Sequence, residues 1–207
     1  MTISRRTLLA VPALALPFLA TSRAHAADSI LGVRSLGDDK APVTVTEWYS
    51  LTCPHCAAFD RESMPQIRKE LIDTGKVRIV YGDFPLDQVA LTAAVVARSL
   101  PPQRYVPFIE ALFASQDRWA FARGVNNTDE IAKMAALAGM SRAAFDTAVA
   151  NNDLRSAILA AQDEAQRIFK VDSTPSFIFN GPGASNRLQA GGLSPEAFAK
   201  LVSDATG

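Results

Sequence analysis

The only two cysteines of the chain are separated by two residues, and they lie where a strand pattern gives way to a helix pattern. Residues 43–49 are rich in β-branched and aromatic side chains, which favours a strand. From residue 54 to about 72, apolar residues recur at helical spacing, and Pro65 predicts a kink there. Residues 77–81 have a second strand pattern. Residues 43–81 therefore predict a β-α-β unit with Cys53-Pro54-His55-Cys56 at its first turn.

The middle of the chain has a different character. Residues 88–169 are rich in alanine and predict four or five helices without a strand, separated near residues 101, 124–127, 139–141 and 151. Strand patterns return at 175–179 and 187–190, and Ser194-Pro195 is typical of a helix start. The order predicts an α/β fold whose first part is residues 27–87 and whose second part is residues 170–207, with 88–169 as a helical insertion.

Apolar stripes in the insertion are interpreted as core. The stripe residues are Phe108, Leu112, Phe113, Ile131, Met134, Leu137, Ile158, Ile168 and Phe169.

Residues 1–26 are predicted to be a cleaved signal peptide. Arg5 and Arg6 precede an uncharged apolar stretch, and Ala24-His25-Ala26 is a small-x-small cleavage signal. The alternative is a membrane anchor, but the apolar run is shorter than the roughly 20 residues that span a bilayer. The arginine pair resembles a twin-arginine export signal, and the general secretory (Sec) route fits as well. We therefore expect an exported, periplasmic protein.

Cleavage after residue 26 would leave eighteen basic and twenty-one acidic residues, a net charge of −3. The full chain has a formal net charge of zero. Nucleic-acid binding needs a basic field, so this function class is not expected. His55 would be the single remaining histidine, and it lies between the two cysteines.

Three uses of a Cys-x-x-Cys pair are open: a structural bridge, half of a zinc site, or a redox centre. A bridge that closes so short a loop removes little chain entropy and would stabilise poorly. A structural zinc site needs about four ligands, and two cysteines with one histidine fall short. The pattern favours redox chemistry, and no metal or cofactor is expected.

The position of Cys53 indicates which sulfur reacts. Pro54 suits the first residue of a helix, which places Cys53 at the N-cap. Unpaired N–H groups and the positive end of the helix dipole stabilise a thiolate there. His55, if protonated, adds positive charge nearby and lowers the cysteine pKa further. A general base or a surface bystander are the alternatives for His55.

The segment from Glu47 to Cys56, Glu-Trp-Tyr-Ser-Leu-Thr-Cys-Pro-His-Cys, resembles the active-site segment of the DsbA family of periplasmic thiol:disulfide oxidoreductases. Residues 170–177, Lys-Val-Asp-Ser-Thr-Pro-Ser-Phe, resemble the cis-proline loop of that family. The resemblance extends from about residue 36 to the C-terminus. It implies a thioredoxin-like fold interrupted by an inserted α-helical domain.

The resemblance also implies residue roles. Cys53 is expected to be the exposed nucleophile and Cys56 its more buried partner. Pro54 and His55 are expected to tune the redox potential. Pro175 is expected to be cis and to lie beside the cysteines, with Thr174 pairing its backbone with an extended substrate.

Glu47 matches the buried acid of the family and has the phase of Val43 and Val45 on the predicted strand. If it is buried, its pKa rises and it is placed to relay protons to Cys56. The alternative is an edge position with the carboxylate in water.

The resulting hypothesis is a dithiol oxidase that donates the Cys53–Cys56 disulfide to reduced exported polypeptides. The family implies reoxidation by a membrane quinone oxidoreductase of the DsbB type, and we expect a monomer. Thr174, where strong oxidants of the family often have valine, motivates a disulfide isomerase or reductase as an alternative. A peptide-binding chaperone without redox turnover is the third hypothesis.

Overall fold

The computed structural model describes residues 30–207, so the predicted signal peptide lies outside the described part of the chain. Five strands form one sheet in the order β1-β3-β2-β4-β5, with β2 and β3 parallel and the other pairs antiparallel. The strands are β1 (Ser35–Leu36), β2 (Val43–Tyr49), β3 (Val77–Asp83), β4 (Ser176–Gly181) and β5 (Ala184–Ala190). Every predicted strand is present, and the short β1 was not predicted.

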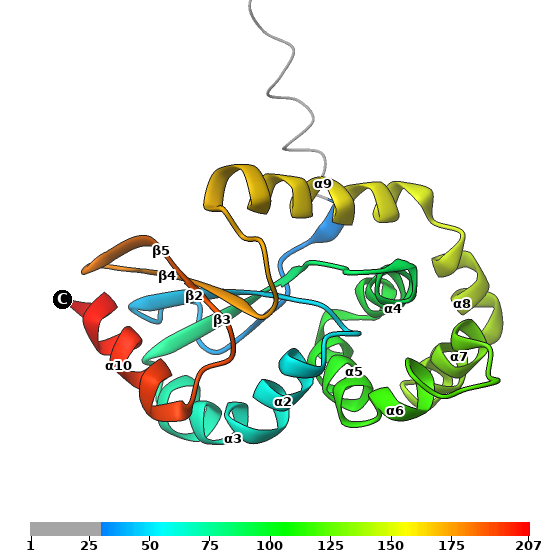
Figure 1. Cartoon of the computed structure of the whole chain (residues 1–207), viewed down its shortest axis with the longest axis horizontal. Coiled ribbons are helices and arrows are strands. Elements are labelled where there is room, and N and C mark those ends of the chain that lie inside the picture. Colours follow the sequence, from blue (N-terminus) through cyan, green and yellow to red (C-terminus); the bar gives the residue numbers. More distant parts are fainter. Residues whose placement is uncertain (1–29) are drawn as a thin grey trace, which may run out of the picture.

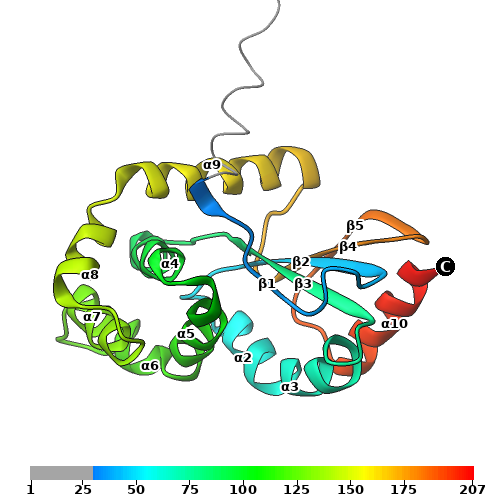
Figure 2. The same ribbon diagram turned by 180° about the vertical axis from the view of Figure 1, so that it is seen from behind.

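Helices cover both faces of the sheet. In Figure 1, α2 (Pro54–Glu62), α3 (Met64–Ile67) and α10 (Pro195–Thr206) lie below the sheet, and α9 (Asn152–Phe169) lies above it. The view from behind in Figure 2 shows the same two layers. The remaining helices gather at one side of the sheet, next to the start of α2.

The helix predicted for residues 54–72 is broken rather than merely kinked. Pro65 has no N–H to donate and clashes with the preceding turn, so α2 ends at Glu62 and α3 restarts at Met64. A wide π-type turn, Arg68–Ile72, completes the segment. The break lets α2 and α3 follow the curved face of the sheet.

Residues 88–169, all of which the structure describes, form six helices: α4 (Gln88–Ser99), α5 (Pro102–Ala114), α6 (Gln116–Trp119), α7 (Asn127–Leu137), α8 (Arg142–Val149) and α9. The predicted breaks are all present. The count exceeds the prediction because Ser115 separates α5 from the very short α6. An α/β fold with a helical insertion between β3 and β4 is confirmed.

Most of the apolar stripe residues in the insertion are buried as predicted, including Phe108, Leu112 and Ile158. Met134 and Phe169 are half-buried against the core, whereas Leu137 is 85% exposed and Ile168 is 53% exposed. The two exposed residues lie in the last turn of their helices, α7 and α9, where the stripe extends beyond the elements that cover it. The interpretation of these two residues as core is therefore wrong.

A buried polar cluster joins the insertion to the sheet. Arg98 of α4 donates from Nε to the Asp83 carboxylate at the end of β3, at 2.5 Å, and both side chains are 4% exposed. Arg98 also donates to the carbonyl of Tyr81 at 2.8 Å. The hydroxyl of Tyr49, on β2, donates to Asp83 at 3.1 Å and lies 2.6 Å from that of Tyr105, on α5. The end of β2, which precedes the cysteine turn, and the end of β3 are thereby fixed against the helices.

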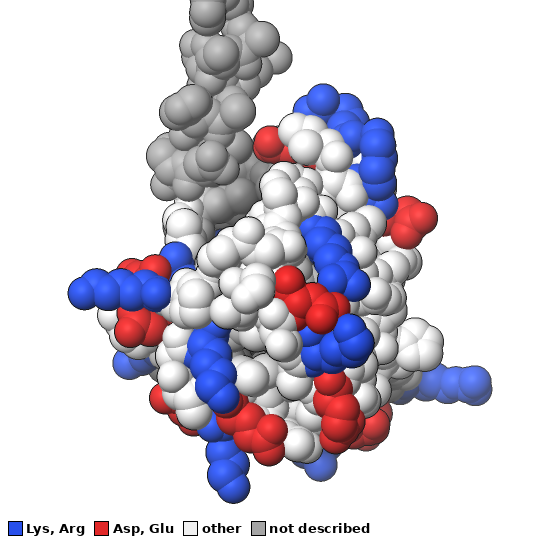
Figure 3. Space-filling model, turned by 90° about the vertical axis from the view of Figure 1, so that its left-hand side faces the viewer, with Lys and Arg blue, Asp and Glu red and all other residues white. Residues whose placement is uncertain are grey.

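The opposite side of the molecule, formed by β5 and α10, has no concentration of one charge. Figure 3 looks onto this side and shows basic and acidic side chains interspersed. Asp204 of α10 accepts from Lys200 at 3.0 Å and from Arg187 of β5 at 3.3 Å. Among residues 30–207, no helix has the length and apolar composition required to cross a membrane.

Candidate active site

The two cysteines lie where the turn after β2 enters α2. Cys53 has extended backbone angles (φ −81°, ψ 118°) and is the N-cap of α2, with Pro54 as the first helical residue. Its N–H donates to the carbonyl of Ser50 at 3.0 Å. The local prediction is confirmed, because a proline at this position fits the fixed backbone angle of a helix start.

Both thiols are free, and both cysteines are largely shielded from solvent. Cys53 is 4% exposed and Cys56 is completely buried. The order of burial follows the expectation, but the description of Cys53 as exposed is wrong. Its Sγ lies under the loop before β4 and donates to the carbonyl of Thr174 at 3.3 Å, which covers the sulfur.

The environment separates the acidities of the two thiols. The pKa of Cys53 is lowered to about 5, chiefly by a hydrogen bond from the Cys56 thiol. The Thr174 side chain and the backbone N–H groups of Cys56 and His55 lower it further, against the opposing effect of burial. Burial, followed by the hydrogen bond to Cys53 and its charge, raises the pKa of Cys56 far above the usual range. The proton of the pair therefore stays on Cys56 and the negative charge on Cys53.

The backbone and side chain of His55 have different places at the site. The backbone N–H points to the Cys53 sulfur from the first turn of α2. The imidazole is exposed and lines a groove of about 410 Å³ between α2 and the segment that leads into α10. Phe59, Glu62 and Leu193 also line this groove, which opens beside the cysteines.

Glu47 is buried, 3% exposed, on the central strand β2. Its neighbours in the sheet are Tyr81 on β3 and Phe177 on β4. Burial, and next the negative charge of Asp60, raise the pKa of Glu47 to about 8. The predicted burial is confirmed, and the edge position with the carboxylate in water is wrong. Glu47 also acts electrostatically on Cys56, since its charge raises the pKa of that thiol.

The peptide bond between Thr174 and Pro175 is cis, as the resemblance implied. The carbonyl of Pro175 accepts from Gly191 N–H at 2.8 Å, which ties the loop to the segment after β5. The Thr174 hydroxyl oxygen is buried and has no hydrogen-bond partner in the dithiol form among residues 30–207. It therefore remains available to a thiolate on Cys53.

Sequence reasoning missed the distant residues that hold the cysteine turn. Gln116 of α6 donates to the carbonyls of Leu51 and Cys53 at 2.7 and 3.1 Å. The Thr52 hydroxyl donates to Asp87, the N-cap of α4, at 2.7 Å. These partners are 35 to 65 positions away in the chain, and no local pattern marks them.

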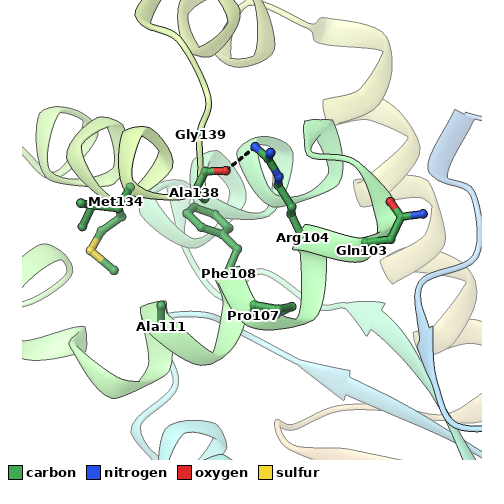
Figure 4. A pocket seen from close by; sticks show the side chains of 9 residues that line it. Gln103, Arg104, Pro107, Phe108, Ala111, Met134, Ala138 and Gly139 are labelled. Atoms are coloured by element: carbon green, nitrogen blue, oxygen red, sulfur yellow. Dashed lines mark hydrogen bonds between the residues drawn. The ribbon is translucent and has the colours of Figure 1, made fainter.

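A second, separate pocket lies within the insertion. Figure 4 shows this cavity of about 470 Å³ between α5 and α7, lined by Pro107, Phe108 and Met134. Arg104 crosses its rim and donates to the carbonyl of Ala138 at 2.7 Å. No residue of the turn from Ser50 to Cys56 lines it, so it is not part of the dithiol site. Within residues 30–207, no group of three or more histidine, cysteine or acidic side chains is arranged to hold a metal ion.

A sheet of this order, with a Cys-x-x-Cys pair at the start of the helix that follows a central strand, and a cis-proline facing it, defines a thioredoxin-fold dithiol protein. A family model described as thioredoxin matches residues 31–203, and the chain belongs to that family. The helical insertion between β3 and β4 makes it DsbA-like within the family.

The solved structures support this placement. The crystal structure of alpha-DsbA1 from Wolbachia pipientis matches with a TM-score of 0.76 and 27% identity, covering 84% of this chain and 90% of that one. A structure named as a protein-disulfide isomerase, from Novosphingobium aromaticivorans, has a TM-score of 0.69 and 28% identity, covering 82% and 97%.

A Rickettsia typhi protein, provisionally named a protein-disulfide oxidoreductase, is 28% identical over 152 residues. The match covers 73% of this chain and 56% of the relative. The chain thus spans little more than half the length of the curated relatives it matches first.

Proposed function

We propose that the protein is an exported thiol:disulfide oxidoreductase that donates the Cys53–Cys56 disulfide to reduced polypeptides. The observation that carries the proposal is the opposite shift of the two thiol pKa values, down to about 5 for Cys53 and up for Cys56. A stable thiolate on Cys53 favours the reduced form of the enzyme, which makes its disulfide a strong oxidant.

The reaction has two steps. A substrate thiolate attacks Sγ of Cys53, the Cys53–Cys56 bond breaks, and Cys56 leaves and takes up a proton because its pKa is high. A second substrate thiolate then attacks the substrate sulfur of the mixed disulfide, and Cys53 leaves as a thiolate. The substrate loses two electrons and gains a disulfide, while the enzyme becomes the dithiol. A low pKa makes Cys53 a good leaving group.

The surroundings of the cysteines support the binding of an extended chain. The lining of the groove beside α2 includes the apolar residues Phe59 and Leu193. The loop at Thr174 and Pro175 lies directly over Cys53. In this proposal the backbone of Thr174 pairs with the substrate, and the chain continues into the groove.

The roles proposed for Pro54, His55 and Glu47 follow from their positions around the two cysteines. Pro54 starts the helix that orients N–H groups toward Cys53, and His55, whose imidazole is exposed at the groove, tunes the redox potential. Glu47 accepts and returns the proton of Cys56. Reoxidation by a membrane quinone oxidoreductase of the DsbB type, a periplasmic location and a monomeric state belong to the same proposal.

To test the proposal, the protein without residues 1–26 is equilibrated with glutathione buffers. The fluorescence of the buried Trp48 measures the fraction that is reduced. A potential above about −180 mV supports an oxidase, and one at or below about −230 mV contradicts it. A Cys53→Ser variant that still oxidised reduced peptides at the wild-type rate would also contradict it.

Two observations favour a disulfide isomerase as a second candidate function. Thr174, rather than valine, precedes Pro175, and a similar structure is named as a protein-disulfide isomerase. Strong refolding of a scrambled substrate by the purified protein, together with a dimer in sedimentation, would support the isomerase over the oxidase.

A further inference from the structure

Gln116 joins the helical insertion to the cysteine turn. It lies on the four-residue helix α6 and is 7% exposed. Its amide nitrogen donates to the carbonyl of Leu51 at 2.7 Å and to that of Cys53 at 3.1 Å. A primary amide has two N–H donors, so both are used on this one turn.

The turn has few bonds of its own. As a neutral thiol, the Cys53 side chain makes no capping hydrogen bond to α2, although serine, threonine or aspartate often does so at an N-cap; the N–H groups of His55 and Cys56 act on its thiolate. Within the turn, the N–H of Cys53 donates to the carbonyl of Ser50. Further hydrogen bonds come from distant residues: Gln116 of the insertion, Asp87, which accepts from the Thr52 hydroxyl, and Leu86, whose N–H donates to the Ser50 hydroxyl at 3.3 Å. The backbone angles of Cys53 therefore depend on contacts from distant residues.

The position of the Cys53 carbonyl affects the sulfur. This carbonyl accepts from Ala57 N–H at 3.2 Å as well as from Gln116 at 3.1 Å, so two donors fix its position. With the carbonyl fixed, the N–H groups of His55 and Cys56 face the Cys53 sulfur. Rotation of the turn would move these donors away and would leave a thiolate less well stabilised.

We propose that Gln116 is a positioning residue of the dithiol site, through which the helical insertion sets the redox equilibrium of Cys53. It touches neither sulfur, and it acts by fixing the carbonyls of Leu51 and Cys53. The inference deepens the function proposed above and concerns the same site. The test compares the redox equilibrium constant of a variant with that of the wild type. The result therefore does not depend on whether the wild-type potential is that of an oxidase.

The test compares Gln116→Leu with a matched variant, Asn127→Leu. Asn127 also donates from one side-chain amide to two backbone carbonyls, those of Trp119 and Ala120, at 2.8 and 3.0 Å. These carbonyls belong to the C-terminal end of α6, so Asn127→Leu loosens the helix that carries Gln116 but leaves the two bonds to the cysteine turn in place. Loss of two amide bonds should lower the melting temperature of both variants.

Only Gln116→Leu should change the thiol chemistry. We expect its equilibrium constant with glutathione to fall on the order of tenfold toward a weaker oxidant, with a higher midpoint in the thiolate titration of Cys53. Asn127→Leu should stay within about twofold of the wild type in both measurements.

The proposal fails if Gln116→Leu keeps the wild-type equilibrium constant, or if Asn127→Leu shifts it equally. If Gln116→Leu does not fold, Gln116→Asn replaces it. The shorter amide does not span both carbonyls, so a shift in the same direction of several-fold supports the proposal and no shift overturns it. A wild-type potential in the reductant range would contradict the oxidase and would leave this comparison intact.

Discussion

Cys53 and Cys56 are one helical turn apart, yet they differ strongly in acidity. The difference arises because Cys53 faces donors, while Cys56 is completely buried and adjoins Glu47. An isolated cysteine has a pKa of about 8.5, so the fold rather than the residue type creates the reactive sulfur.

The first prediction concerns Cys53 directly. Titration of the reduced protein, followed by the ultraviolet absorbance of the thiolate, should have a midpoint near pH 5. The same titration of Cys53→Ser should lack this transition, since the pKa of Cys56 is raised. A midpoint near pH 8.5 in the wild-type protein would contradict the assignment.

The second prediction concerns Glu47. Its pKa is about 8 in the folded protein and about 4.5 when unfolded, so the folded state binds more protons between these values. The contribution of Glu47 to the free energy of unfolding should therefore fall as pH rises from about 4.5 to 8. Glu47→Gln removes this loss and should be more stable than the wild type at pH 8, by up to about 4 kcal/mol.

The check on Glu47 is urea denaturation of both proteins across this pH range. The difference between them should vanish below about pH 4.5, where the carboxyl is protonated in both states. An equal stability of the two proteins at pH 8 would mean that Glu47 is ionised in the folded state.

At the scale of elements, the contact between β3 and α4 depends on one buried ion pair. Arg98→Leu would leave the Asp83 carboxylate buried without its cation, at a cost of about 3–5 kcal/mol. The exposed pair of Arg142 with Asp146 provides the control, and Arg142→Ala should cost less than about 1 kcal/mol. Urea midpoints measure both. Equal losses in the free energy of unfolding would show that the buried Arg98–Asp83 pair contributes no more than an exposed pair.

The elements also show what a sequence predicts well. The strand before Cys53, the helix after it and the N-cap position were predictable because their signals are contiguous: β-branched residues, Pro54 and helical spacing. The break at Ser115 was not, because no proline or glycine marks it. Leu137 and Ile168 follow the helical period but lie at helix ends, so periodicity alone places them wrongly in the core.

The residues of the candidate site also fall into two groups, those that a local sequence pattern predicts and those that it does not. Cys53, Cys56 and the buried Glu47 could be found from local pattern, and the cis bond before Pro175 only from resemblance. Gln116 and Asp87 contact the turn across long stretches of chain, and their residue types are ordinary on a helix surface. Tertiary packing gives them their roles, so no local signal identifies them.

For the whole molecule, the acidity of Cys53 links redox state to stability. The pKa of Cys53 is depressed in the folded dithiol, so its thiolate stabilises the folded reduced protein. This contribution is complete above about pH 8.5 and is lost as pH falls through about 5. The reduced protein should therefore be more stable than the oxidised protein at pH 7, by about 1–3 kcal/mol after solvent screening.

Thermal unfolding of the two redox forms measures this difference. The gap should narrow as the pH approaches 5, and Cys53→Ser should show no such pH dependence. A higher melting temperature for the oxidised form at pH 7 would contradict a strongly oxidising disulfide.

The contact between Cys53 and Thr174 joins residues 121 positions apart. A chain is synthesised from its N-terminus, so the cysteine pair is made well before the loop that covers it. Until β4 docks against β2, the sulfur lacks the Thr174 hydrogen bond and the shielding of that loop. A newly made chain therefore carries a cysteine pair that is open to solvent and to other thiols, and Cys53 is covered only when the folding of the chain is complete.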